Sequence, residues 1–214
     1  MGFEKRVIDH RGANRSYKVY VPTVAPPYPA VVFLHGFGES GEDGEVQAKV
    51  GLGEAIEKSP EEWPFLVLFP QKKDHGVLWP GYRGLVDDVL AQAEKEFPID
   101  RTRTYLTGLS QGGNGTLTLA RSLRWKFAAV APICGWADPF TAAQDLAETP
   151  TWLFHGDADG AVPVEASVAV ARLLERFGGD VKLTVYPGVG HDSWTQAYQE
   201  AGLARWFLSH TARS

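Results

Sequence analysis

The stretch LTGLSQGGNGT, residues 106–116, places a single serine among four glycines. Ser110 stands in a G-x-S-x-G spacing, which is typical of a nucleophile that projects from a sharp turn between a strand and a helix. Glycines lack a Cβ atom and therefore let such a turn pack closely against its neighbours. The apolar run over residues 104–110 predicts the strand, and the pattern over residues 111–123 predicts the helix. We therefore expect Ser110 to attack carbonyl carbons.

A serine hydroxyl is a weak nucleophile unless a histidine takes its proton and a carboxylate orients that histidine. Two later loops offer these groups in the chain order serine, acid, histidine. The stretch WLFHGDADGAVP carries Asp157 and Asp159, and the stretch VYPGVGHDSW carries His191. We expect Asp157 to form a turn or to cap a helix. The sequence therefore predicts a catalytic triad of Ser110, Asp159 and His191.

The segments that must position these residues alternate between strand and helix patterns. Two segments, residues 5–10 and 16–22, predict an antiparallel opening. Mostly apolar runs predict strands buried on both faces, over residues 30–36, 65–70, 104–110, 127–135, 151–157 and 181–188. Helical patterns cover residues 84–97, 111–123, 162–179 and 193–210. This alternation predicts an α/β fold with about eight strands, mostly parallel, and helices on both faces. In such sheets the chemistry lies at the carboxyl ends of the strands.

The composition predicts one globular domain over residues 1–214, with 44% hydrophobic and 22% charged residues. A net charge of −5 without blocks of like charge argues against nucleic acid as a partner. The chain shows no secretory signal and no run of the roughly 18 apolar residues that a membrane span needs. We therefore expect a cytoplasmic protein that makes no contact with membranes.

The sequence predicts no metal and no other cofactor. Its six histidines lack the spacings of a zinc site. Cys134, the only cysteine, lies in the apolar run FAAVAPICG. Because an apolar site raises the pKa of a thiol, we expect Cys134 to be buried for packing and not reactive.

Three motifs make the chain resemble the α/β-hydrolase family over essentially its whole length. GLSQGG resembles the nucleophile elbow of that family, HGDADGAVP its acid loop and GVGHDSW its histidine loop. In the acid loop of the family the catalytic residue is the Asp three positions before Val, which selects Asp159 over Asp157. The resemblance implies the α/β-hydrolase fold. The short segment WADPFTAAQDLAETP between the sixth and seventh expected strands leaves no room for a cap domain.

A fourth motif, FLHGFGESG, resembles the oxyanion loop that follows the third strand in many esterases of the family. The resemblance assigns the oxyanion hole to the backbone N–H groups of Phe37 and Gln111. His35 in this motif is then structural and not a base.

The compact chain looks like small esterases of the phospholipase/carboxylesterase, polyhydroxybutyrate-depolymerase-like and feruloyl-esterase-like groups. A serine nucleophile, where dienelactone hydrolases carry cysteine, argues against that subfamily. Trp79, Trp136 and Trp194 fall near expected strand ends at the same edge, which indicates a partly aromatic substrate site.

The sequence therefore predicts a metal-free serine carboxylesterase (a carboxylic ester hydrolase) that acts on short to medium-chain or aromatic esters, with a small-molecule ester as its partner. A peptidase that uses the same triad and a non-catalytic binding protein with the same fold remain alternatives. Exposed aromatic residues at the rim of the site could equally mark the contact of a homodimer.

Overall fold

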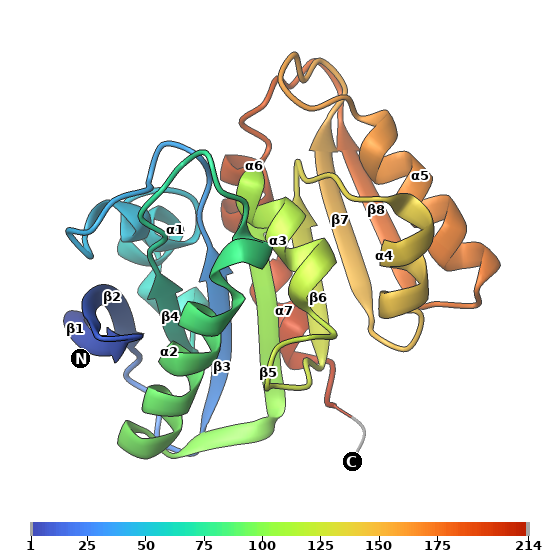
Figure 1. Cartoon of the computed structure of the whole chain (residues 1–214). Helices are drawn as coiled ribbons and strands as arrows, with labels where there is room; N and C mark the ends of the chain where they lie inside the picture. The colour runs from blue at the N-terminus through green and yellow to red at the C-terminus, as the bar shows by residue number, and fades with distance from the viewer. Residues whose placement is uncertain (1, 213–214) are drawn as a thin grey trace.

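A computed structural model describes residues 2–212 of the chain (Figure 1). Their eight strands form one sheet in the order β1-β2-β4-β3-β5-β6-β7-β8. The strands are β1 Gly2–His10, β2 Ala13–Val21, β3 Tyr28–Leu34, β4 Leu66–Pro70, β5 Ile99–Leu109, β6 Ala129–Ile133, β7 Thr151–Gly156 and β8 Val181–Tyr186. β2 pairs antiparallel with both β1 and β4, and the remaining pairs are parallel. The predicted mostly parallel sheet with an antiparallel opening is confirmed.

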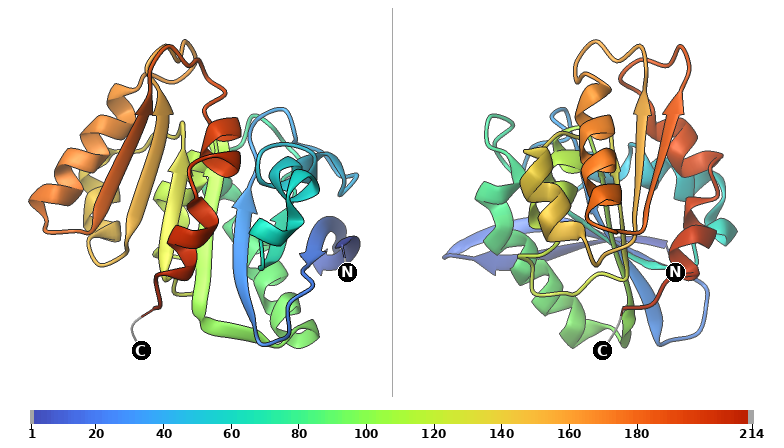
Figure 2. Two further views of the ribbon diagram at one scale, coloured as in Figure 1. Left: turned by 180° about the vertical axis from the view of Figure 1, so that it is seen from behind. Right: turned by 90° about the vertical axis from the view of Figure 1, so that its right-hand side faces the viewer.

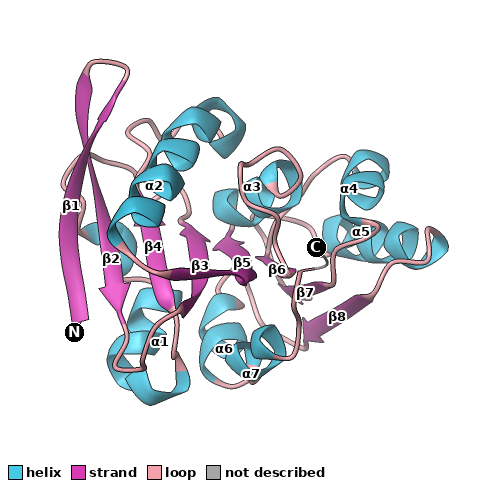
Figure 3. Ribbon diagram, turned by 90° about the horizontal axis from the view of Figure 1, so that it is seen from below, coloured by secondary structure: helices cyan, strands magenta, loops and turns pink. Residues whose placement is uncertain are grey.

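Helices cover both faces of this sheet, and two hydrophobic clusters fill the space beneath them (Figure 3). On one face lie α2 Arg83–Glu96, α3 Gln111–Leu119, α4 Pro139–Leu146 and α5 Glu165–Arg176. On the other face lie α1 Leu52–Lys58, α6 Trp194–Gln199 and α7 Leu203–Leu208, the last two seen in front in the left view of Figure 2. Between β6 and β7 the chain forms only α4. None of the helices within residues 2–212 combines the length and the apolar character that crossing a bilayer requires.

The order of the strands creates a switch point between β3 and β5. The chain places β4 on one side of β3 and then β5 on the other side. Leu34 pairs with Gly108, so the chain leaves both strands at nearly the same level of the sheet. Ligands of open α/β sheets bind at the carboxyl ends of the strands where the order reverses in this way. The fold therefore puts the Ser110 turn and the 35–41 loop side by side at the position expected of a binding site.

Two expectations about the carboxyl-terminal third of the chain were wrong. β8 is the edge strand of the sheet, and Val185 is 37% exposed, although its run was expected to be buried on both faces. The helix expected over residues 193–210 is two helices, because Gly202 adopts a left-handed conformation with φ of 72° between α6 and α7. Both helices still pack on the sheet, since Tyr198 of α6 and Phe207 of α7 are buried. Two further helices, α1 and α4, were not predicted from the sequence.

Candidate active site

Ser110 occupies a strained turn between β5 and α3. Its φ of 54° and ψ of −116° lie outside the regions that most residues adopt. Close packing holds the turn: a Cβ on Gly112 would lie 1.7 Å from the carbonyl oxygen of Leu34, and one on Gly113 would lie 2.5 Å from that of Ile133. Glycine is therefore required at positions 112 and 113, because the neighbouring backbone occupies the space that a side chain would need.

His191 connects Ser110 to Asp159. The imidazole Nε2 lies 2.9 Å from Ser110 Oγ, and Nδ1 lies 2.7 Å from Asp159 Oδ2. Because a carboxylate only accepts hydrogen bonds, Nδ1 carries the ring proton and Nε2 accepts the hydroxyl proton of Ser110. The structure thus brings together the three side chains that the sequence nominated, from the ends of β5, β7 and β8.

The carboxyl group of Asp159 is buried and fully hydrogen-bonded. Its side chain has no exposed surface. One oxygen accepts the N–H groups of Ala161 and Val162, at 2.8 and 2.9 Å, and the other accepts His191. Burial opposes ionisation, but these three hydrogen bonds outweigh it and lower the pKa of Asp159 below its ordinary value. Asp159 is therefore an anion at neutral pH and can stabilise a protonated His191.

Asp157 was expected to form a turn or to cap a helix, but its carboxylate instead bonds to a distant loop. Its Oδ1 accepts the N–H of Gly188 at 2.6 Å and so joins the acid loop to the histidine loop. The two loops approach closely, because a Cβ on Gly156 would lie 2.1 Å from the carbonyl oxygen of Val189. Asp157 itself is exposed and contributes to the position of the histidine loop.

Phe37 and Gln111 lie on either side of Ser110, the first in the 35–41 loop and the second at the start of α3. The backbone N–H groups of both residues donate no hydrogen bond to any group within residues 2–212. Gln111 is the first residue of α3. The first N–H groups of a helix have no partner within the helix, and the positive end of the helix dipole lies at this terminus, next to Ser110. The Gln111 side chain donates to the carbonyl oxygen of His75 at 3.1 Å, and the His75 ring lies 4.5 Å from that of Phe37. His75 was not nominated by the sequence, since no motif marks it.

The three tryptophans nominated as substrate contacts occupy different environments. Trp79 is wholly buried and donates from Nε1 to the carbonyl oxygen of His35 at 2.9 Å, so substrate cannot reach its ring. Its nomination is corrected: the ring belongs to the core under α3. Trp136 and Trp194 are both half-buried, and the Trp194 ring packs edge-on against His191 at 5.5 Å. These two remain candidates for contact with substrate.

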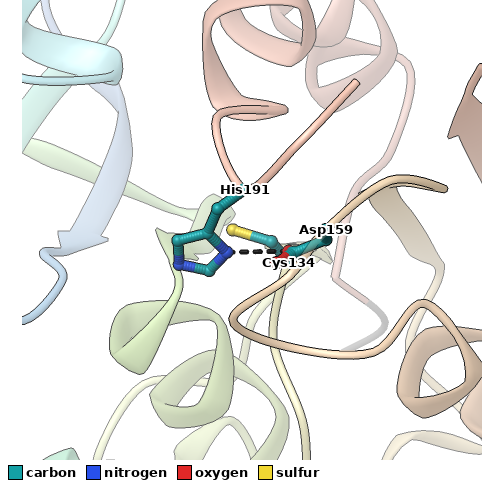
Figure 4. Close-up of side chains that lie close together, drawn as sticks. All are labelled: Cys134, Asp159 and His191. Atoms are coloured by element: carbon teal, nitrogen blue, oxygen red, sulfur yellow. Dashed lines mark hydrogen bonds and ion pairs between the residues drawn. The ribbon is translucent and has the colours of Figure 1, made fainter. Parts of the chain in front are cut away.

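Cys134 lies beside His191 and Asp159 (Figure 4). Its thiol is buried, as expected, and burial raises its pKa to about 12. Its sulfur, a nitrogen of His191 and an oxygen of Asp159 lie within 4.8 Å of one another, the one group of three potential metal ligands that residues 2–212 contain. Because His191 and Asp159 already bond to each other and the thiol keeps its proton, the arrangement fits a triad better than a metal site.

A second serine and histidine pair lies in the core. His155 Nδ1 is 2.7 Å from Ser167 Oγ, and its Nε2 is 2.9 Å from the carbonyl oxygen of Val162. His155 is fully buried and Ser167 is 1% exposed, so no substrate reaches either group. This pair joins the end of β7 to α5. The contact of His155 with Val162 also supports the acid loop.

His35 has the structural role that the sequence predicted. Its Nδ1 lies 2.7 Å from the carbonyl oxygen of Gly36, and its Nε2 lies 3.1 Å from the backbone nitrogen of Lys72. The second contact requires Nε2 to accept, so the ring is neutral. Burial lowers the pKa of His35 to about 3, consistent with that state.

The sheet, its helices and the residues at its carboxyl edge define a hydrolase of the α/β-hydrolase fold. The chain belongs to the phospholipase/carboxylesterase family, a family of serine hydrolases whose sequence model matches residues 80–207.

Individual relatives cover most of the chain. Acyl-protein thioesterase 1 of Gibberella zeae is 26% identical over an aligned length of 228; the alignment covers 88% of this chain and 94% of the relative. The probable feruloyl esterase C of Aspergillus oryzae is 24% identical over an aligned length of 201, and that alignment covers 87% of this chain and 71% of that protein. The crystal structure of a thermostable esterase matches 98% of this chain with a TM-score of 0.86 and 29% identity, and the chain spans 63% of the length of that esterase.

Proposed function

We propose that this protein is a serine carboxylesterase that hydrolyses short to medium-chain or aromatic esters of small molecules through an acyl-Ser110 intermediate. The observation that carries the proposal is the unbroken chain of hydrogen bonds from Ser110 Oγ through His191 to the buried Asp159 carboxylate. We further propose that residues 1–214 act as one catalytic domain without a cap.

Acylation begins when Ser110 Oγ attacks the carbonyl carbon of the ester and its proton passes to His191 Nε2. The imidazolium that forms is stabilised by the Asp159 carboxylate, which keeps its own negative charge. The carbonyl oxygen becomes an oxyanion, and we assign the N–H groups of Phe37 and Gln111 as its donors. Collapse of this intermediate breaks the bond to the alcohol, which leaves with the proton from His191.

Deacylation repeats these steps with water. His191 Nε2 takes a proton from water, whose oxygen attacks the acyl carbon on Ser110. The second oxyanion occupies the same site. Its collapse releases the carboxylic acid and returns the proton to Ser110 Oγ, so the enzyme regains its starting state.

The half-buried rings of Trp136 and Trp194 support a substrate with a flat or apolar acyl or alcohol group. Trp194 follows the histidine loop and contacts His191, while the exposed ring of Phe37 lies at the 35–41 loop beside Ser110. Aromatic side chains of this kind bind small apolar groups by burying their surface.

The decisive experiment measures hydrolysis of nitrophenyl esters from acetate to a long-chain acyl group by the wild type and by Ser110→Ala. We expect the wild type to prefer short chains and the variant to lose kcat/KM by about 10⁴-fold or more. A fluorophosphonate probe should label the wild type and leave Ser110→Ala unlabelled.

Ser209→Ala is the matched control, because Ser209 Oγ lies 3.2 Å from His210 Nδ1 near the end of the chain, in another contact between a serine and a histidine. It should keep activity within about threefold, since the contacts of that pair, with Trp206 and Asp180, do not involve Ser110, Asp159 or His191. A folded wild type that hydrolyses none of these esters would refute the esterase proposal and favour a narrow peptidase or a binding role.

Thioester hydrolysis is the second candidate activity, because a relative that is 26% identical over 88% of this chain is an acyl-protein thioesterase. Ser110 can attack the carbonyl carbon of an ester or of a thioester, and the same N–H groups can bind the oxyanion that forms from either. Comparing kcat/KM for an oxygen ester and a thioester of the same acyl group separates the two. A preference of more than about tenfold for the thioester would reassign the main activity.

A further inference from the structure

The 35–41 loop carries an acidic side chain beside the nucleophile. Glu39 Oε2 lies 3.1 Å, and Ser110 Cβ 3.6 Å, from the position that a Cβ on Gly36 would occupy. The carboxyl group of Glu39 and the Ser110 turn therefore both lie beside Gly36. The triad and the two oxyanion donors leave this group without a role.

Glu39 binds the backbone of its own loop. Its Oε2 accepts the N–H of Gly36 at 2.9 Å, which closes a turn around Phe37. The carbonyl oxygen of Glu39 accepts Nε2 of Gln71 at 3.0 Å, and the N–H of Ser40 points to the carbonyl oxygen of Phe37 at 3.4 Å. These contacts fix the residues on both sides of Phe37, whose own N–H is left free.

A buried ammonium group lies on the other side of the loop. Lys72 has no exposed surface, and its Nζ donates to Ser40 Oγ and to the carbonyl oxygen of Asp74, both at 3.0 Å. Within residues 2–212 no carboxylate oxygen lies within 4.0 Å of Lys72 Nζ. The charges of Asp74 and Glu39 still favour the charged form of Lys72, whose pKa burial lowers to about 8. Glu39 therefore also balances a positive charge beneath the loop.

The state of Glu39 follows from the same contacts. Burial raises the pKa of its carboxyl group, while the hydrogen bonds from the N–H groups of Gly36 and Glu39 and the charge of Lys72 oppose that rise. In either protonation state one carboxyl oxygen can still accept the N–H of Gly36. What the loop requires of residue 39 is thus an acceptor at this position, more than a charge.

We propose that Glu39 is a positioning residue for catalysis, which holds the N–H of Gly36 so that the N–H of Phe37 points at the oxyanion. This inference rests on the proposed esterase function, because it assigns Phe37 to the oxyanion hole. An interaction that acts only on the oxyanion affects the transition state and leaves binding of the ester unchanged.

The test compares Glu39→Gln and Glu39→Ala with the wild type, using a nitrophenyl ester that the wild type hydrolyses. Glutamine keeps an acceptor oxygen of the same reach, and alanine removes it. We expect Glu39→Ala to lower kcat about 10- to 100-fold with KM within about twofold, and Glu39→Gln to keep at least about a third of kcat. A trifluoromethyl ketone, which forms an oxyanion on Ser110, should bind Glu39→Ala more weakly by a factor similar to the loss in kcat.

Glu42→Ala is the matched control on the neighbouring turn, because Glu42 is exposed and its ion pairs within residues 2–212 are with Arg15 and Lys73 at the surface. It should retain wild-type kcat. Unfolding temperatures of the variants show whether each is folded at the assay temperature, and a destabilised variant is assayed below its own transition.

The outcomes separate this inference from the proposed function. An active wild type with unchanged kcat in Glu39→Ala overturns the positioning role and leaves the esterase proposal intact. Equal losses in Glu39→Gln and Glu39→Ala, or a rise in KM alone, also overturn it, because charge or substrate binding would then account for the effect. A wild type without esterase activity removes the proposed function itself.

Discussion

Ser110 and His191, which are hydrogen-bonded neighbours, are held in place by different means. Ser110 follows β5 near the centre of the sheet, with β3 and β6 on either side, whereas His191 follows the edge strand β8 (Figure 1). Around Ser110 the backbones of three elements approach so closely that a single Cβ atom would overlap a carbonyl oxygen. The loop before His191 also passes close to Gly156, but the side-chain positions of Gly188 and Gly190 face open space. Hydrogen bonds from His191 to Asp159 and from Gly188 to Asp157 help to set its position.

This difference shows that one site can obtain its precision in two ways. The nucleophile is positioned by packing, so a disturbance there is expected to destabilise the whole protein. The histidine is positioned by hydrogen bonds in a partly exposed loop, with 28% of its side chain accessible, so a disturbance there is expected to affect activity first.

The largest effect is expected from adding one methyl group on the packed side. In Gly112→Ala the new Cβ would lie 1.7 Å from the carbonyl oxygen of Leu34, so the strand or the helix must move. We expect a loss of more than about 4 kcal/mol in the free energy of unfolding, or no folded protein. Chemical denaturation followed by circular dichroism measures it.

Gly190→Ala is the matched change on the histidine side. There the new Cβ would meet nothing nearer than the carbonyl oxygen of Ala158, at 3.9 Å. Its stability should stay within about 1 kcal/mol of the wild type. Equal destabilisation by the two substitutions would contradict the contrast between packing and hydrogen bonding.

The next effect is expected from Asp159→Asn, which keeps the shape of the side chain and removes its charge. Asparagine can still accept the N–H groups of Ala161 and Val162 but cannot stabilise a protonated His191. We expect kcat to fall about 10²- to 10⁴-fold, with far less loss of stability than in Gly112→Ala. Nitrophenyl ester kinetics and a thermal melt of the same sample measure both.

Asp157→Asn serves as the control for this loop, because Asp157 contacts the backbone of Gly188 and not the His191 ring. It should keep kcat within about fivefold. If Asp157→Asn lost as much activity as Asp159→Asn, the assignment of the acid would have to be revised.

The smallest effect is expected in the pH dependence of stability, through the buried His35 at the end of β3. The pKa of His35 is lowered to about 3 in the folded protein, below its ordinary value near 6.5. The neutral ring therefore supports folding fully above pH 6.5, and this support is lost as the pH falls toward 3. Between pH 7 and 4.5 the wild type should lose about 2 kcal/mol of stability through this group alone.

The variant His35→Gln isolates that contribution. It should be less stable than the wild type at pH 7, but the difference between the two should shrink by about 2 kcal/mol at pH 4.5. Denaturation curves at both pH values give the comparison. A difference that does not change with pH would show that His35 does not titrate as described.

The sequence predicted most of the sheet and brought Ser110, His191 and Asp159 together as a group, because both the strands and these three loops leave strong local patterns. Buried parallel strands require continuous apolar runs, and the turn at Ser110 requires glycines on both sides, so the positions of β3 to β7 and of Ser110 can be read directly. The acid loop and the histidine loop can be located in the same way, because each directly follows an apolar run that predicts a strand.

The remaining features depend on contacts between distant segments. The run at β8 has the composition of a buried strand, and only the strand order leaves it at the edge. Trp79 lies near a strand end in sequence, but its ring turns under α3 to reach the carbonyl oxygen of His35. Glu39 and Lys72 were missed because their importance arises from the meeting of two loops that lie more than thirty residues apart.

The single thiol has a consequence for studying motion in this molecule. Cys134 is fully buried beside His191 and Asp159, so a disulfide reagent can reach it only while the surrounding structure is open. The rate of its modification therefore measures how often the protein opens around its reactive centre. Because the chain has no other cysteine, each molecule records these openings at one defined place.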